Sequence, residues 1–307
     1  MSLDIYPRRA IPDRVLLISR RTHELRMGMV PRIGVALIQM FILFRVALET
    51  GMRLHAFAFL PNQYQLVISE PRNHSRVSEF IERLNRYLAR VFNARNRTRG
   101  YFWDSEPTHI VELLDPESAL DAMVYTLTNP QKAGLAVAPG RWLGLESSVD
   151  AIGAPATPVA KPPGMASYLP DSLDFVLVKP AFFDHMDDAD FRELLAKRVR
   201  AASLKIRRER RQKGLRTLSN AEILETHHRD TPRETEADEE ERKADRTRSL
   251  FRGAPALCRE AELTLQGFHD AYRTAWERWS DGDHDVLFPP GTDKLRRVHG
   301  ACCVQLT

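Results

Sequence analysis

The sequence predicts an α+β fold in the first part of the chain and a mainly helical region toward the C-terminus. Residues 52–70 alternate with the period of two that is typical of strands, and a turn interrupts the alternation. Long segments of helical character, residues 33–49 and 75–97, come before and after this predicted hairpin. Strands and helices that follow one another in this way predict a mixed α+β domain.

A short apolar run at residues 14–19 is predicted to form the first strand. The segment after it carries Arg20, Arg21 and Arg26. One interpretation is a solvated loop. The other is a loop that grips phosphate, because the planar guanidinium group of arginine can donate two hydrogen bonds to phosphate oxygens. The residues alone leave both interpretations open.

Residues 33–49 are strongly apolar and are predicted to form a helix that ends at Gly51. The run is short, and Gln39 and Arg45 interrupt it, so we expect a buried helix and not a membrane span. The N-terminal segment has no continuous apolar stretch of the kind that signal peptides carry.

The hairpin places two amides on one of its faces. Its strands are predicted at residues 53–60 and 63–69, joined by Pro61-Asn62. On the second strand, Gln63 and Gln65 project from the face opposite Tyr64. A polar pair on one sheet face usually points to solvent, but beside a catalytic tyrosine it can point into a site.

The helix predicted at residues 75–97 is amphipathic and basic. A basic helical face is most often solvated surface. Arginine with interleaved aromatic residues, here Tyr87 and Phe92, also suits contact with a nucleic-acid backbone and stacking on its bases. We therefore expect DNA contact along this face. Its arginines include Arg83, Arg86, Arg90, Arg95 and Arg97.

A further strand is predicted at residues 108–114, and Asp115-Pro116 is typical of a helix start. The helix is expected to run to Thr128, where Asn129-Pro130 would break it. Tyr125 and Asn129 lie four residues apart, which places them one helical turn apart on the same face.

Two segments resemble motifs of the single-tyrosine HUH transposases, the group that includes the REP-associated tyrosine transposases. They are LPNQYQL at residues 60–66 and VYTLTNPQKAGL at residues 124–135. In that family the first motif carries two histidines that hold the catalytic metal, and this chain has Gln63 and Gln65 in their places. The second motif implies that Tyr125 is the nucleophile and that Asn129 is the third metal ligand.

The resemblance implies a ferredoxin-like antiparallel sheet with helices on one face. It also implies single-stranded or hairpin DNA as the partner and Mg²⁺ or Mn²⁺ as the cofactor. In such a reaction the tyrosine attacks a phosphodiester, keeps the DNA through a 5′-phosphotyrosine and frees a 3′ hydroxyl. That hydroxyl can reverse the step on a new end, which amounts to DNA strand transfer.

The two glutamines put this chemistry in question. Glutamine offers only neutral carbonyl oxygens, whereas protein sites for Mg²⁺ usually include a carboxylate or phosphate. Three hypotheses follow. The chain is a weakened single-tyrosine transposase, a domesticated or decayed non-catalytic DNA-binding protein on the same fold, or an RNA-binding protein that uses the basic helix.

The resemblance ends near residue 147, so residues 1–147 are expected to form the catalytic or DNA-binding domain. Residues 148–180 are predicted to be a linker, and residues 181–307 a mainly helical region. Residues 197–216 are dense in arginine and lysine and form either a solvated surface or an auxiliary grip on the DNA backbone. The residues that would supply this grip are Lys205, Arg207, Arg208, Arg210 and Arg211.

Composition narrows the class of protein. The chain has 307 residues, of which 43% are hydrophobic and 28% charged, as in soluble globular proteins. The net charge of +4 and the pI of about 9.0 suit a nucleic-acid partner. The three cysteines lack zinc-site spacing, and their odd number fits reduced thiols. We therefore expect a cytoplasmic protein without a membrane partner, and a homodimer stays open.

Overall fold

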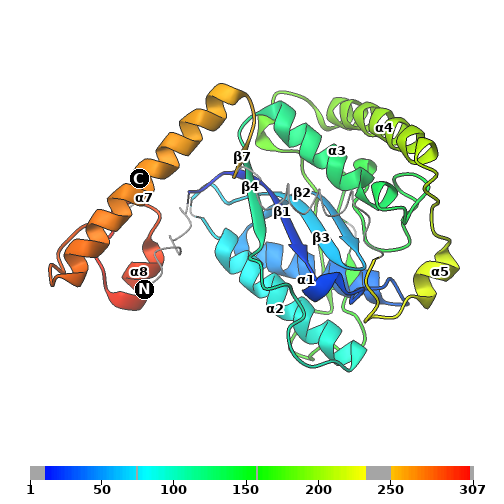
Figure 1. The fold of residues 1–307 in the computed structure, drawn as a ribbon, viewed down its shortest axis with the longest axis horizontal. Coiled ribbons are helices and arrows are strands. Elements are labelled where there is room, and N and C mark those ends of the chain that lie inside the picture. Colours follow the sequence, from blue (N-terminus) through cyan, green and yellow to red (C-terminus); the bar gives the residue numbers. More distant parts are fainter. Residues whose placement is uncertain (1–10, 74, 157, 233–249, 305–307) are drawn as a thin grey trace.

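The structure is a computed structural model that describes residues 11–73, 75–156, 158–232 and 250–304. Its main strands are β1 (Val15–Arg21), β2 (Arg53–Leu60), β3 (Gln63–Ser69), β4 (His109–Leu113) and β7 (Phe251–Arg252). They form one sheet in the order β2-β3-β1-β4-β7 (Figure 1). β1 is antiparallel to both β3 and β4, and β7 joins β4 in parallel.

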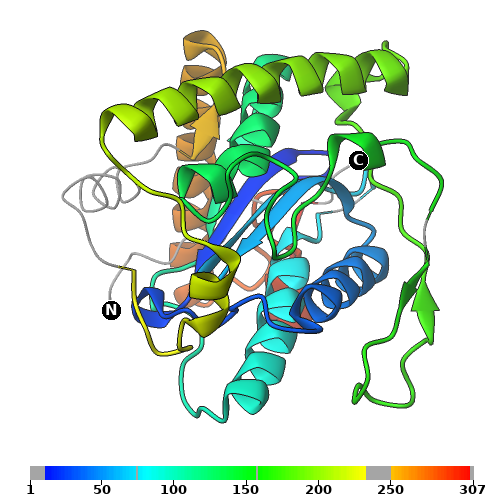
Figure 2. The same cartoon turned by 90° about the vertical axis from the view of Figure 1, so that its right-hand side faces the viewer.

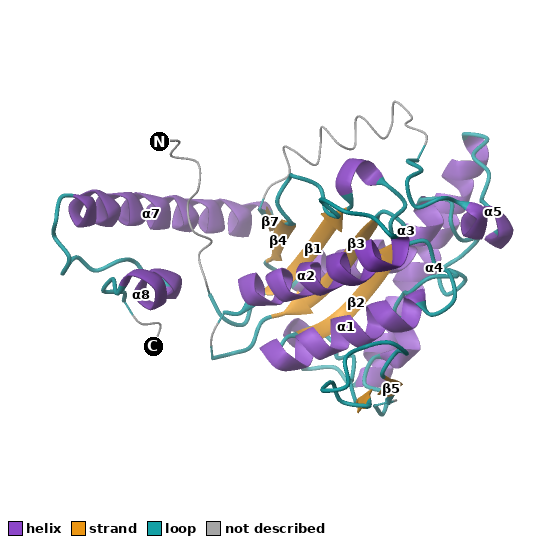
Figure 3. Ribbon diagram, turned by 90° about the horizontal axis from the view of Figure 1, so that it is seen from below, coloured by secondary structure: helices purple, strands orange, loops and turns teal. Residues whose placement is uncertain are grey.

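Helices cover both faces of this sheet (Figures 1 and 2). On one face lie α1 (Val35–Thr50) and α2 (Val77–Asn96), which run across the strands together in Figure 3. On the other lie α3 (Pro116–Lys132) and α4 (Asp188–Gln212). Strands β2 and β3 are buried along almost their whole length, which requires cover on both faces. The expectation of helices on one face is therefore wrong, because α3 packs against β2 and β3.

The hairpin has the predicted bounds, and the first strand does not. β1 extends through Arg21, beyond the expected end at residue 19. Arg20 pairs with Tyr64 and Arg21 with Gln63 on β3, so the two arginines belong to the ladder and not to a loop. Backbone pairing satisfies donors and acceptors that a buried loop would leave unpaired. As strand neighbours, Arg20 and Arg21 project from opposite faces of the sheet.

The predicted break in the third helix is also wrong. α3 continues through Pro130 to Lys132. Its start is as predicted, since Asp115 accepts a hydrogen bond of 2.7 Å from the backbone N–H of Ser118. Proline costs the helix one hydrogen bond, and the burial of Asn129 and its neighbours offsets that loss. Because the helix continues, Tyr125 and Asn129 stay one turn apart on one face.

The expected linker at residues 148–180 packs against the sheet domain. It contains a small two-stranded sheet, β5 (Val159–Ala160) and β6 (Ser172–Leu173), which contacts α1. The backbone N–H of Val178 donates to the carbonyl of Leu54 at 3.1 Å, so this segment also binds β2. Its buried side chains in the main core are Ile152, Val159, Leu169, Leu173 and Leu177.

The C-terminal part divides into two regions. α4 belongs to the main core, because Phe191 and Leu195 are fully buried within it. The remaining α-helices of the described residues are α5 (Asn220–Glu225), α7 (Pro255–Ser280) and α8 (Asp293–His299). α7 projects away from the sheet (Figure 1), and Phe288 packs between α7 and α8 in a small second core. Within the described ranges, no helix is long and apolar enough to cross a membrane.

Candidate nucleic-acid interface

The two faces of β3 have different chemistry. Tyr64 faces α2, where its hydroxyl donates a hydrogen bond of 2.8 Å to Oδ1 of Asn85. Burial raises the pKa of Tyr64 well above its usual value, so this phenol stays protonated. Gln63 and Gln65 alternate with Tyr64 and therefore project from the other face, the one that α3 covers.

Strand register gives Gln65 small neighbours, Ala58 of β2 and Ser19 of β1. It places Gln63 between Leu60 of β2 and Arg21 of β1. Residues paired in this way share a face, with Cβ atoms roughly 5 Å apart. The structure therefore brings one predicted DNA contact, Arg21, beside one predicted metal ligand, Gln63.

Two of the three predicted metal ligands each have a buried amide atom without a partner in the described part of the chain. Gln65 is 4% exposed, and its Oε1 accepts no hydrogen bond. Asn129 on α3 is also 4% exposed, and its Nδ2 donates none. A buried polar atom without a partner costs about 1–3 kcal/mol. Such atoms are suited to binding a polar ligand.

Tyr125 is only partly buried on α3, one turn before Asn129. The ammonium group of Lys132 lies 5.2 Å from the centre of its ring. The phenol therefore has a cation beside it and access to solvent, in contrast to Tyr64. The residues predicted as nucleophile and third ligand share a helix that packs on the strand bearing the two glutamines.

The donors at this site do not fit a divalent metal ion. Gln63, Gln65 and Asn129 are all neutral amides, whereas Mg²⁺ sites in proteins usually contain a carboxylate. In the part of the chain that the structure describes, no three His, Cys, Asp or Glu side chains gather where they could hold a metal. The predicted cofactor, Mg²⁺ or Mn²⁺, therefore finds no charged ligand among these three residues.

Glu146 is a residue that the sequence reasoning did not single out. It bridges to Ala58 of β2, on the side opposite Gln65, and so projects from the same sheet face. Burial raises its pKa to about 7. Its Oε1 accepts the backbone N–H of Trp142 at 3.2 Å, while its Oε2 has no partner among the described residues. Nothing local in the sequence marks it, because the bridge joins residues far apart in the chain.

Several predicted DNA contacts are engaged within the protein instead. The guanidinium of Arg20 donates to the carbonyl oxygens of Asp104, at 2.8 Å, and Glu106. It therefore holds the loop before β4. Arg95 likewise donates to the carbonyl oxygen of Ile33 at 2.7 Å, which joins the end of α2 to the segment before α1.

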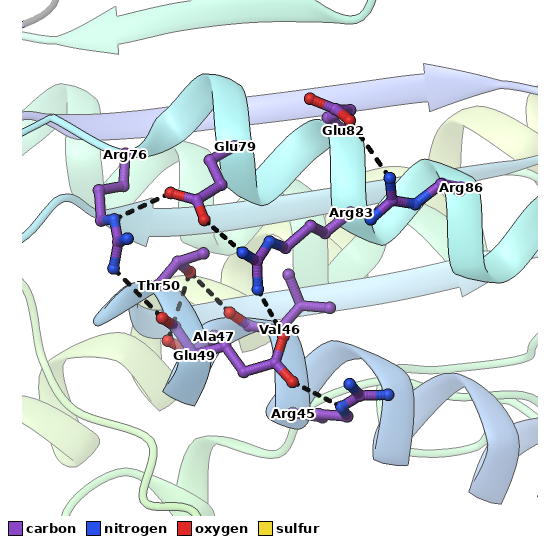
Figure 4. Close-up of polar contacts among 10 residues, drawn as sticks. All are labelled: Arg45, Val46, Ala47, Glu49, Thr50, Arg76, Glu79, Glu82, Arg83 and Arg86. Atoms are coloured by element: carbon purple, nitrogen blue, oxygen red, sulfur yellow. Dashed lines mark hydrogen bonds and ion pairs between the residues drawn. The ribbon is translucent and has the colours of Figure 1, made fainter. Parts of the chain in front are cut away.

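The middle of the basic helix is neutralised by acids (Figure 4). Arg83 pairs with Glu49 of α1 at 3.0 Å and with Glu79 of α2 at 2.6 Å. Arg86 pairs with Glu82 at 3.4 Å. The Arg83–Glu49 pair fastens α2 to α1, and the other two pairs lie within α2. Together they leave less positive charge on this face than the sequence suggests. Arg90, like Arg86, is exposed.

The other two predicted contacts, Arg26 and Arg97, meet in a pocket of about 330 Å³. The pocket lies between the loop that follows β1, the C-terminal end of α2 and a segment around residue 228. Two further arginines, two histidines and a tyrosine ring line it, namely Arg99, Arg229, His23, His228 and Tyr101. The sequence marked the arginines, but it did not show that residues so far apart would converge.

One arginine of the basic segment on α4 contacts the end of α3, near Tyr125. Arg210 donates to the carbonyl oxygen of Lys132 at 2.8 Å and to that of Arg216 at 2.6 Å, and so joins α4 to the end of α3. Lys205 lies 3.9 Å from Glu209 on its own helix. The same helix carries Arg207, Arg208 and Arg211. Their contact with the DNA backbone stays a prediction.

Comparison with known proteins adds little at the level of sequence. No family model and no curated protein matches the chain. One similar solved structure is a REP-associated tyrosine transposase bound to a REP hairpin, at 13% identity and a TM-score of 0.39, covering 46% of this chain and 80% of that chain. Another is a proposed transposase from Deinococcus radiodurans, at 17% identity and a TM-score of 0.26, covering 36% of this chain and 82% of that one. Similarities of this size do not establish an activity, so function has to be argued from the site.

Proposed function

We propose that the chain is a DNA-binding protein of the single-tyrosine transposase type, with weakened strand-cleaving chemistry. The observation that carries the proposal is that α3, which bears Tyr125 and Asn129, packs on β3, which bears Gln63 and Gln65. The motif resemblance assigns these positions to one site, and strand register with helix packing supports that assignment. The strand order β2-β3-β1-β4 also agrees with the expected ferredoxin-like sheet.

In the proposed reaction, the Tyr125 oxygen attacks the phosphorus of a phosphodiester. A bond forms between the phenolic oxygen and phosphorus, and the bond from phosphorus to the 3′ oxygen breaks. The tyrosine loses its proton, and the leaving oxygen gains one to become a 3′ hydroxyl. In the enzymes that this chain resembles, a metal ion would stabilise the charge that develops on the phosphate.

The side chains at the proposed site are better suited to binding a phosphate than to cleaving its ester bond. The unpartnered Nδ2 of Asn129 is a hydrogen-bond donor that a phosphate oxygen can accept. Lys132 and Arg21 supply positive charge near Tyr125 and Gln63 respectively. Neutral amides in place of charged ligands do not offset the charge of the transition state. We therefore expect the chain to bind DNA but to cleave it slowly or not at all.

The test is a covalent-adduct assay on a single-stranded DNA hairpin with Mg²⁺ or Mn²⁺. A denaturation-resistant adduct that Tyr125→Phe abolishes, with hairpin binding unchanged, supports the proposed nucleophile. The double variant Gln63→His with Gln65→His is expected to raise adduct yield at least about tenfold, in line with the large effects of metal ligands on activity. If neither the native chain nor the double variant forms an adduct, Tyr125 is not a nucleophile.

The second candidate is a non-catalytic DNA-binding protein on the same fold, which the absence of a charged ligand among the three amides favours. It predicts hairpin binding, no adduct from the native chain and an adduct from the double histidine variant. An RNA-binding protein is the third candidate. It predicts that an RNA hairpin of equal length binds at least as tightly as the DNA hairpin at the same salt concentration.

A further inference from the structure

The basic pocket is built from three segments that are held together by hydrogen bonds. The backbone N–H of Met27 donates to the carbonyl of Asp230 at 2.9 Å, which docks the segment after α5 on the loop after β1. Asn96 of α2 donates to the carbonyl of Gly28 at 2.8 Å, and the N–H of His23 to that of Phe102 at 2.9 Å. The walls of the pocket are therefore fixed relative to one another.

The backbone around the pocket is strained. Four non-glycine residues in the described ranges have positive φ, and three of them are Glu24 (52°), Leu25 (56°) and Arg97 (53°). All three belong to the segments that line the pocket. Each left-handed residue costs of order 1 kcal/mol or more, and such strain gathers at ligand sites. His23 of the short helix η1 (His23–Leu25) and Arg26, which follows it, both line the pocket.

The charge of the pocket is positive and mostly uncompensated. Arg26 is paired with Glu24. Arg97, Arg99 and Arg229 make no ion pair with an acid in the described ranges, and each can donate two parallel hydrogen bonds to an anion. An anionic ligand is therefore favoured, and phosphate suits the fork of the guanidinium group.

The pocket also presents an aromatic ring to solvent. Tyr101 is 87% exposed, although tyrosine usually covers part of its ring. Its ring centre lies 6.5 Å from that of His23. An exposed aromatic face beside several arginines is the arrangement on which unpaired bases stack. The volume of about 330 Å³ lies at the lower end of the range for small-ligand sites, roughly 300–1,000 Å³.

The pocket lies at the same end of the sheet as the amides. The backbone N–H of Thr22, which lines the pocket, donates to the carbonyl of Asn62 at 2.8 Å. Asn62 immediately precedes Gln63, and Thr22 immediately follows Arg21. Because α2 and α3 cover opposite faces, a nucleic-acid strand that passes Gln63 would reach the pocket by rounding this end of the sheet.

We propose that this pocket binds one unpaired nucleotide, with its base on Tyr101 and its phosphate between Arg97 and Arg229. The nucleotide is either part of a strand held by the amide site or a free nucleoside phosphate. The first source rests on the proposed function, and the second does not.

The test compares three ligands by titration: a DNA hairpin with a single-stranded extension, the same hairpin without it, and free deoxyadenosine monophosphate. The variants are Tyr101→Ala and Arg229→Ala. Matched controls are Tyr168→Ala, since Tyr168 is 82% exposed and does not line the pocket, and Arg141→Ala, since Arg141 is exposed elsewhere. Tyr101→Phe keeps the ring and is expected to behave as the native chain.

Loss of one stacked base weakens binding by about five- to a hundredfold. If Tyr101→Ala and Arg229→Ala weaken binding of the extended hairpin by this amount and change the affinity for the plain hairpin by less than about twofold, the pocket binds a nucleotide within a strand. A loss confined to the mononucleotide supports the free ligand. Equal losses for both hairpins, or no loss for any ligand, overturn the proposal. If the extension still matters but Tyr125 forms no adduct in any variant, the proposed chemistry fails and the pocket stands.

Discussion

The ammonium nitrogen of Lys132 lies 5.2 Å from the centre of the Tyr125 ring, two helical turns further along α3. A cation at this distance is attracted by the ring face. Under the proposed function, this cation would attract a phosphate bound at Tyr125.

Lys132→Ala should therefore weaken hairpin binding about three- to tenfold and lower the slope of log Kd against log salt concentration by about one. Lys132→Arg should restore the slope, since it keeps the charge. Both are measured by fluorescence anisotropy over a salt series. An unchanged slope in Lys132→Ala would show that Lys132 does not face the DNA.

Arg83 lies in the middle of the basic helix α2 and Arg97 caps its C-terminal end, but the two have different neighbours. Arg83→Ala removes the pairs with Glu49 and Glu79 (Figure 4) and should lower the free energy of unfolding by about 0.5–1 kcal/mol, with hairpin affinity within about twofold. Arg97→Ala should lower hairpin affinity and leave the free energy of unfolding nearly unchanged, because Arg97 lies in the pocket without an acid partner in the described ranges. Urea unfolding and anisotropy on the same preparations separate the two effects. Similar loss of affinity in both variants would contradict the assignment.

Glu70 is a fully buried carboxylate with partners on two sides. One oxygen accepts from the backbone N–H of Arg76 and of Val77 at 3.0 Å, at the start of α2, and the other accepts from Arg14 at 2.8 Å. Glu70→Gln removes the closer of the two carboxylates that pair with Arg14 at a mostly buried site, and leaves Arg14 only the longer pair with Glu112 at 3.4 Å. It should lower the free energy of unfolding by about 3 kcal/mol.

Arg14→Gln should cost a similar amount, and the double variant should cost less than the sum. Urea denaturation followed by circular dichroism gives all three values. A loss below about 1 kcal/mol for Glu70→Gln would show that the helix start does not depend on this carboxylate.

His55 predicts how stability depends on pH. Burial lowers its pKa to about 4, and its ring nitrogens are used by the carbonyl of Val178 at 2.7 Å and the hydroxyl of Ser69 at 2.6 Å. The native state keeps His55 neutral, while the unfolded chain takes up a proton below its ordinary pKa of about 6.5. The free energy of unfolding should therefore fall as pH is lowered from about 6.5 to about 4, by up to about 3 kcal/mol.

His55→Gln cannot take up this proton and should show a flatter profile over the same window. Urea unfolding at a series of pH values tests the difference between the two profiles. Parallel profiles would show that His55 does not set this dependence.

Local pattern predicted much of the sheet and its first helices. The alternation in residues 53–69 predicted both strands of the hairpin with their observed bounds, and the apolar run before it predicted α1 within two residues at each end. The separation of Gln63 and Gln65 from Tyr64 also followed from the period of a strand, because side chains on alternate residues must face opposite ways. The spacing of Tyr125 and Asn129 predicted that they share a helical face.

Only the tertiary structure decided what these side chains meet. Arg83 is neutralised by Glu49 of another helix, while Arg97 joins Arg229 in a pocket, and nothing in the local pattern of the basic helix separates the two. The bridge that brings Glu146 beside Ala58, and the helices on both faces of the sheet, likewise depend on contacts between distant segments. Periodicity is a property of neighbours along the chain, whereas burial and charge pairing depend on the packing of segments that the sequence keeps far apart.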